Sequence, residues 1–144
     1  MDGRLNTYRT IDTLGKSPLD LVLQVYDGAI TAFRAAADSY RENSYEKGHE
    51  AMQRARKFLV HLYTTLDKEK GQDIARSLEK LYTYLICQID VAQATKDQDI
   101  IASNIKILEN LKSGWKGLKD QKAEGKPAPS AAAAPAAGGF TISG

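Results

Sequence analysis

The sequence has little cysteine, little proline and no long hydrophobic run. Its single cysteine, Cys87, has no second cysteine to pair with, so the fold does not depend on an intrachain disulfide bond. No stretch of about 18 consecutive apolar residues occurs, and the N-terminus has no apolar segment of signal-peptide length. These absences predict a chain that neither spans a membrane nor carries an export signal, and they favour a cytoplasmic protein.

An excess of charge of one sign is also missing. The chain has 20 basic and 18 acidic residues, which gives a formal net charge of +2. This balance argues against nucleic acid or an anionic membrane as the main partner. With 144 residues and 42% hydrophobic content, the chain is long enough for one domain with a modest core.

The stretch that begins at Ser17 predicts a long helix. Ser17 is a suitable N-cap, Pro18 suits the first helical position, and Asp20 completes a capping box. Apolar residues then cover well over half of the helix circumference as far as Phe33, and the helix should end near Arg41. Such a helix must be buried on two sides, or on one side with the other held for a partner.

Three further helices follow, with apolar residues at helical spacing. We expect Ser44 to cap the second helix, Gly71 to close it, and Asp97 to cap the fourth helix, which ends near Gly125. The inward-facing apolar residues are Met52, Ala55, Leu59, Leu62 and Leu66; Ile74, Leu78, Leu81, Leu85 and Ala92; and Ile101, Ile105, Leu108, Leu111, Trp115 and Leu118. Because short connections make neighbouring helices antiparallel, the predicted fold is an all-α, antiparallel up-down four-helix bundle.

The bundle should occupy residues 17–124, with a different segment on either side. Residues 1–16 carry Tyr8, Ile11 and Leu14 at three-residue spacing, which fits either an ordered arm or a movable cap over a binding site. Residues 125–144 contain three of the four prolines among alanines and glycines. This composition predicts a disordered tail.

The motifs of common catalytic and metal sites are incomplete. Glu46 and His49 match the Glu-x-x-His motif of a di-metal bundle once, but His61 has no glutamate three residues before it. Neither histidine has the surroundings of a phosphotransfer site, no glycines cluster into a phosphate loop, and Cys87 is interpreted as a small core group. We therefore expect no catalytic residue, metal or cofactor.

Glycines inside the predicted helices are the one local weakness of the bundle. Gly28, Gly114 and Gly117 each cost about 1 kcal/mol relative to alanine. They indicate close approach by another helix, local plasticity around Tyr26 and Trp115, or an imperfection that the fold tolerates.

Three blocks of the sequence carry a family resemblance. The first is Tyr8, followed ten residues later by Pro18 and by LVLQVYDGA over residues 21–29. The second joins TLD over residues 65–67 to GQDIARSLEKLYTY over residues 71–84, and the third joins LENL over 108–111 to Trp115 and Lys116. In order and spacing, the three blocks resemble the flagellin export chaperone family, FliS.

The resemblance implies a cytosolic bundle that binds the disordered C-terminal region of flagellin. It would prevent premature polymerisation and deliver flagellin to the type III export apparatus, with flagellar export gate components as further partners. In that family the chaperone's own N-terminal segment occupies part of the client site until it is displaced. Tyr8, Ile11 and Leu14 would form this cap.

The function that we favour is therefore a non-enzymatic chaperone that buries a partner segment in apolar grooves. The groove residues expected beside the cap are Val22, Tyr26, Tyr82, Ile86, Leu108 and Trp115. The pattern does not separate groove residues from core residues. Two alternatives stay open: a self-associating structural bundle whose extra apolar faces meet in a homodimer, and an enzyme built on a metal-binding bundle.

Overall fold

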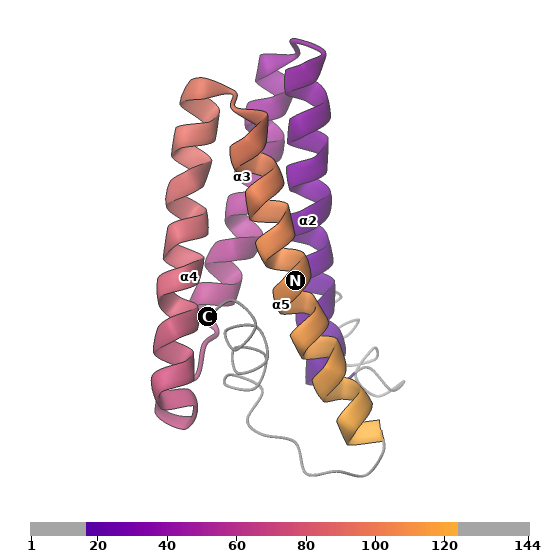
Figure 1. The fold of residues 1–144 in the computed structure, drawn as a ribbon, viewed down its shortest axis with the longest axis vertical. Helices are drawn as coiled ribbons and strands as arrows, with labels where there is room; N and C mark the ends of the chain where they lie inside the picture. Colours follow the sequence, from indigo (N-terminus) through magenta and orange to yellow (C-terminus); the bar gives the residue numbers. More distant parts are fainter. Residues whose placement is uncertain (1–16, 124–144) are drawn as a thin grey trace, which may run out of the picture.

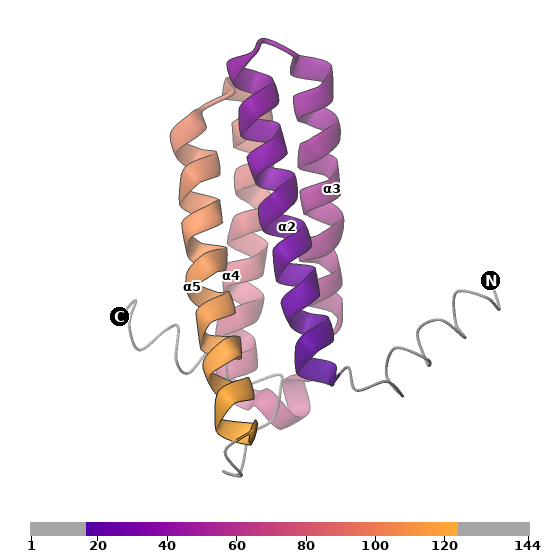
Figure 2. The ribbon, with the colours of Figure 1, turned by 90° about the vertical axis from the view of Figure 1, so that its right-hand side faces the viewer.

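The computed structural model describes residues 17–123, which form four α-helices (Figure 1). They are α2 (Pro18–Arg41), α3 (Tyr45–Thr64), α4 (Lys68–Thr95) and α5 (Gln98–Ala123). Each helix packs against the next, and α5 also packs against α2, which closes the bundle. The α2–α3 and α4–α5 connections lie at one end and the α3–α4 connection at the other (Figure 2). The all-α four-helix bundle predicted from the sequence is confirmed.

Two predicted segments lie outside the residues that the structure describes. They are the cap segment, residues 1–16, and the tail, residues 125–144. Between residues 17 and 123, no helix is long and apolar enough to cross a membrane.

The predicted start and end of α2 are both confirmed. The Ser17 hydroxyl accepts a hydrogen bond from the Asp20 backbone N–H at 3.1 Å, and the Asp20 carboxylate accepts one from the Ser17 backbone N–H at 3.0 Å. This reciprocal pair satisfies two backbone donors that a helix start leaves without partners. After Arg41, the positive φ of 61° at Asn43 turns the chain toward α3. Ser44 occupies the N-cap position of α3 as predicted, but its side chain makes no capping hydrogen bond.

The prediction that Gly71 closes the second helix is wrong. The helix α3 already ends at Thr64, and Asp67 begins α4 by accepting a hydrogen bond from the Lys70 backbone N–H at 3.0 Å. Gly71 lies buried in the first turn of α4, next to Gln72, whose φ of 49° and ψ of −122° break the helix there. The N-capping carboxylate of Asp67 thus decides where the chain turns, and the glycine marks the kink that follows.

The fourth helix starts as the sequence predicts. Lys96 adopts a left-handed conformation with a φ of 56° and ends α4. The Asp97 carboxylate then accepts a hydrogen bond from the Asp99 backbone N–H at 2.8 Å, as an N-cap does.

Most of the predicted inward-facing residues form the core. Leu66, Ile74, Leu81 and Ile105 are the exceptions, because they are only partly buried. The others are buried: Met52, Ala55, Leu59, Leu62, Leu78, Leu85, Ala92, Ile101, Leu108, Leu111, Trp115 and Leu118.

Close approach explains one of the helix glycines. A Cβ atom at Gly28 of α2 would lie 2.5 Å from the tip of the Phe58 ring, which belongs to α3. At Gly117 a Cβ atom would meet nothing within 4 Å, so no neighbour requires that glycine. The first position therefore lets α3 lie against the α2 backbone, whereas the second fits a tolerated imperfection.

Candidate functional site

The structure places the predicted groove residues at different depths. Tyr26, Tyr82, Leu108 and Trp115 are at most 3% exposed and lie in the core. Val22 and Ile86 are partly buried and pack against that core. The predicted cap residues Tyr8, Ile11 and Leu14 lie outside the described residues. Within residues 17–123, Val22 and Ile86 are therefore partly accessible at the surface, whereas the other four are enclosed in the bundle.

Three of the buried residues form a hydrogen-bonded aromatic triad, which consists of Tyr26, Tyr82 and Trp115. The indole N–H of Trp115 donates to the Tyr26 hydroxyl at 2.9 Å, and the Tyr26 and Tyr82 hydroxyl oxygens lie 2.5 Å apart. The ring centroids of Tyr26 and Trp115 are 6.3 Å apart. Because an indole N–H can only donate, the Tyr26 oxygen must be the acceptor of that hydrogen bond. A second hydrogen bond joins the Tyr26 and Tyr82 hydroxyls, and either hydroxyl can be its donor. The triad links α2, α4 and α5 inside the core.

The environment of the triad keeps its hydroxyls neutral. Burial raises the pKa of Tyr26 to about 12, although the hydrogen bonds from Tyr82 and Trp115 act in the opposite direction. Burial, with Tyr26 as a close neighbour, also raises the pKa of Tyr82 well above its usual value of 10. The triad is thus a network of fixed dipoles in which neither tyrosine titrates near neutral pH.

A further buried polar residue, which lies on α5, was not among the residues predicted from the sequence. Asn104 is 1% exposed; its amide nitrogen donates to the Leu85 carbonyl at 3.2 Å, while its Oδ1 atom has no hydrogen-bond partner among the described residues. The signal was present, because Asn104 lies three residues after Ile101 and four before Leu108, at a position where the helical period places core residues.

An exposed apolar strip on α4 lies outside the set of predicted groove residues. Tyr84 is 47% exposed and Val91 is 43% exposed, and with the partly buried Leu81 they recur at spacings of three and seven residues. This spacing puts all three on one side of the helix. Figure 1 shows that α4 and α5 diverge from their connection. We call Leu81, Tyr84 and Val91 the α4 strip.

The incomplete metal motif does not gain ligands from the fold. His49 is held by a hydrogen bond of 2.6 Å between its Nδ1 atom and the Tyr40 hydroxyl. In the part of the chain that the structure describes, no group of three or more His, Cys, Asp or Glu residues could hold a metal ion.

The interpretation of Cys87 as a core group is wrong. Its side chain is exposed, because Leu85 and Ile89, two residues away on either side, point into the core and leave Cys87 on the opposite side of α4.

Comparison with known proteins agrees with this fold. The model of the family "Flagellar protein FliS" matches residues 1–122. The chain is 26% identical over 119 residues to the flagellar secretion chaperone FliS of Vibrio cholerae. The matched region covers 80% of this chain and 88% of that protein. It is 30% identical over 106 residues to the Salmonella typhimurium protein of the same name, covering 73% of this chain and 78% of that one.

A third relative, the flagellar secretion chaperone FliS of Campylobacter jejuni, is 28% identical over 107 residues, 74% of this chain and 84% of that protein. The family is one of chaperones and not of enzymes, so the expectation of a non-enzymatic protein is confirmed. The resemblance found in three sequence blocks is confirmed as well. The chain belongs to the FliS family of flagellar proteins.

Proposed function

We propose that this protein is a cytoplasmic flagellar export chaperone. It binds the disordered C-terminal region of flagellin in apolar grooves, prevents premature polymerisation and delivers flagellin to the export apparatus, where export gate components receive it. Membership of the FliS family supports a role in flagellar secretion, since the matched relatives are named flagellar secretion chaperones.

The observation that carries the proposal is the apolar surface that the closed bundle leaves uncovered. On the α4 strip, Tyr84 and Val91 remain nearly half exposed, although all four helices already share a core. A client helix with apolar residues three and four apart matches this kind of surface, as in other helix-in-groove complexes. Full burial of one such side chain contributes about 1.5 to 3 kcal/mol, so a few contacts suffice for a reversible complex.

The predicted groove residues take two roles in this proposal. Val22 and Ile86 are partly buried and offer direct contacts. Tyr26, Tyr82, Leu108 and Trp115 support the groove from inside the core, and they contact the client only if it separates α4 from α5.

The N-terminal cap is the regulatory part of the proposal. Tyr8, Ile11 and Leu14 compete with the client as an intramolecular ligand, so alanine at all three positions should strengthen flagellin binding. The test is titration of this variant and of the unchanged chain with a flagellin C-terminal peptide, followed by Trp115 fluorescence.

A separate test addresses the client. If flagellin that lacks its C-terminal region binds as tightly as complete flagellin, the client assignment is refuted.

A homodimer is the second candidate, because the same α4 strip could be covered by a second copy of the chain. Sedimentation of the free protein and of its mixture with flagellin separates the two possibilities. The chaperone proposal expects any dimer to dissociate when flagellin is added. A dimer that flagellin leaves unchanged supports the self-associating structural bundle.

A further inference from the structure

A basic, apolar-lined pocket lies between α2 and α3. It contains none of the predicted client residues, although its Val25 lies one helical turn from Val22. It has a volume of about 510 Å³ and is lined by Val25, Arg54, Lys57, Phe58 and His61. Val25 and Phe58 are partly buried, whereas the three basic residues are exposed. The pocket thus combines an apolar base with cationic or titratable side chains at its edge, and we call it the α2–α3 pocket.

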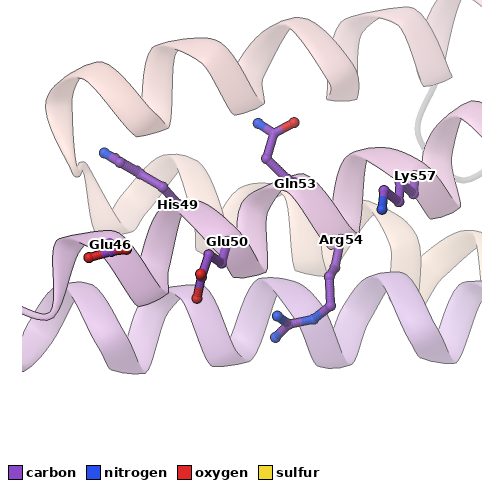
Figure 3. Close-up of a pocket in the computed structure, with 6 residues that line it drawn as sticks. All are labelled: Glu46, His49, Glu50, Gln53, Arg54 and Lys57. Carbon is purple, nitrogen blue, oxygen red and sulfur yellow. The ribbon is translucent and has the colours of Figure 1, made fainter.

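The surface continues along α3 with the opposite charge. A neighbouring hollow is lined by Glu46, Glu50 and polar residues of α3, and it shares Arg54 and Lys57 with the α2–α3 pocket. Figure 3 shows the two glutamates on the N-terminal half of this face and the two cations on the C-terminal half, with Glu50 and Arg54 directed toward the same side. From Glu46 to His61 the face extends over about 22 Å at 1.5 Å per residue.

The charges on this face are not used inside the molecule. Elsewhere basic side chains pair with carboxylates of neighbouring helices: Arg34 with Glu109, Arg56 with Asp90, and Lys112 with Asp27. In contrast, the side chains of Arg54, Lys57 and His61 form no ion pair or hydrogen bond within residues 17–123, and neither do those of Glu46 and Glu50. They are therefore available to a partner.

We propose that this face binds an amphipathic helical segment of a second protein, distinct from the flagellin client. One large apolar side chain of the segment lies on Val25 and Phe58, and its carboxylates lie over Arg54, Lys57 and His61. The charge gradient of the face sets the orientation, because any basic end of the segment is attracted to Glu46 and Glu50. A helix of about four turns covers the full length.

The chain's own terminal segments do not carry the negative charge that the α2–α3 pocket would attract. Residues 1–16 contain three basic residues, Arg4, Arg9 and Lys16, against two aspartates, so their side chains carry a net charge of +1. The charged residues within 124–144 are Glu124 and Lys126, whose charges cancel. Neither segment offers a cluster of carboxylates to the basic pocket, whereas a separate acidic helix does.

The test uses the full chain and a fluorescent, alanine-based helical peptide of about 16 residues. The peptide carries one phenylalanine with glutamates three and four residues from it. Matched peptides replace the glutamates by glutamine or by lysine. Fluorescence anisotropy should show that the glutamate peptide binds about tenfold more tightly than the lysine peptide, with affinity that falls as salt rises. Equal binding of the three peptides would overturn the proposal.

Two variants locate the site. Arg54→Glu with Lys57→Glu should reduce binding of the glutamate peptide about tenfold. Lys80→Glu with Lys106→Glu makes the same change in net charge at exposed positions outside the pocket and should leave binding nearly unchanged. Circular dichroism must show that both variants are folded. Equal losses in the two variants would mean that only net charge matters, and the pocket would then be refuted as the site.

A competition experiment separates this site from the client site. The bound peptide should remain in place when flagellin is added, because the two sites share no residue. Displacement by flagellin would show that the pocket belongs to the client site and would refute a second partner. If flagellin fails to bind while the peptide binds with the expected charge dependence, the client proposal fails and the second site stands.

Discussion

The Tyr26 hydroxyl accepts the indole proton of Trp115 at 2.9 Å while it lies 2.5 Å from the Tyr82 hydroxyl. One oxygen atom thus connects α5 to α4 through α2, in a core that is otherwise almost entirely apolar. A buried polar group is costly when it lacks a partner, so this oxygen satisfies two neighbours at once. Removing it affects three residues.

Tyr26→Phe should therefore destabilise the protein more than the loss of one ordinary hydrogen bond. It leaves the Trp115 N–H and the Tyr82 hydroxyl buried without a partner, at a cost of about 1 to 3 kcal/mol for each. We expect a loss of about 3 kcal/mol in the free energy of unfolding, measured by urea denaturation with Trp115 fluorescence. Tyr84→Phe, at an exposed site, is the control and should change stability by less than about 0.5 kcal/mol.

Tyr82→Phe should have a smaller effect, because the Tyr26 hydroxyl still accepts from Trp115. A loss of about 1 kcal/mol is expected in the same urea experiment. If Tyr82→Phe were as damaging as Tyr26→Phe, the central role of Tyr26 in the triad would be wrong.

The triad also predicts a loss of stability at alkaline pH. The pKa of Tyr26 is about 12 in the folded protein and about 10 when the chain is unfolded, so the unfolded state loses its proton first. The stabilisation is complete below pH 10 and is lost as pH rises from 10 to about 12, by about 3 kcal/mol for Tyr26. Tyr82 acts in the same direction, since its pKa is raised as well.

Urea denaturation between about pH 9 and pH 12 measures this dependence. The slope of stability against pH should be shallower in the Tyr26→Phe variant, because one titrating group is gone. An unchanged slope would show that the alkaline loss comes from other groups.

Gly28 and Gly117 make a matched pair for the close approach of α3. At an open helix position, Gly117→Ala should stabilise the protein by up to about 1 kcal/mol through helix propensity. Gly28→Ala should lose that gain, because its Cβ atom would lie 2.5 Å from the Phe58 ring and must displace it. Thermal denaturation of the two variants compares them directly, and equal gains would contradict the predicted contact.

Replacing Asn104 should stabilise the protein, in contrast to the tyrosine substitutions. The Oδ1 atom of Asn104 is buried and has no partner within residues 17–123, so the amide contributes less than its desolvation costs. Asn104→Leu should raise the free energy of unfolding by about 1 kcal/mol. A loss of stability in urea denaturation would show that the hydrogen bond to the Leu85 carbonyl outweighs the unpaired oxygen.

Local signals explain which parts of the fold could be predicted from the sequence. The capping box at Ser17, the N-cap at Asp97 and the helical period of the apolar residues each depend on a few neighbouring positions, and each was found. Gly71 was misplaced because two signals compete near it, and the side-chain hydrogen bond of Asp67 proved stronger than the tendency of glycine to end a helix.

The candidate site was harder to predict for a geometric reason. Core and groove residues follow the same 3.6-residue period, so Tyr26 and Val22 look alike in the sequence, yet the first is fully buried and the second only partly. Tyr84 and Val91 lie off the main apolar stripe of α4, where only the arrangement of the other helices reveals that they are exposed. Which of these residues meet a client stays a prediction.

The buried hydrogen bonds join α2, α4 and α5 through the triad, and α4 to α5 through Asn104. Among the described residues, α3 takes part in neither and is held in the core by apolar side chains such as Met52 and Leu59. Hydrogen bonds have a narrow range of distance and angle, whereas apolar attraction has no preferred direction. The C-terminal half of α3, which lies beyond the Tyr40–His49 hydrogen bond, can therefore shift slightly without leaving a buried polar group unpaired. A protein bound to its outer face could adjust the bundle there at the lowest energetic cost.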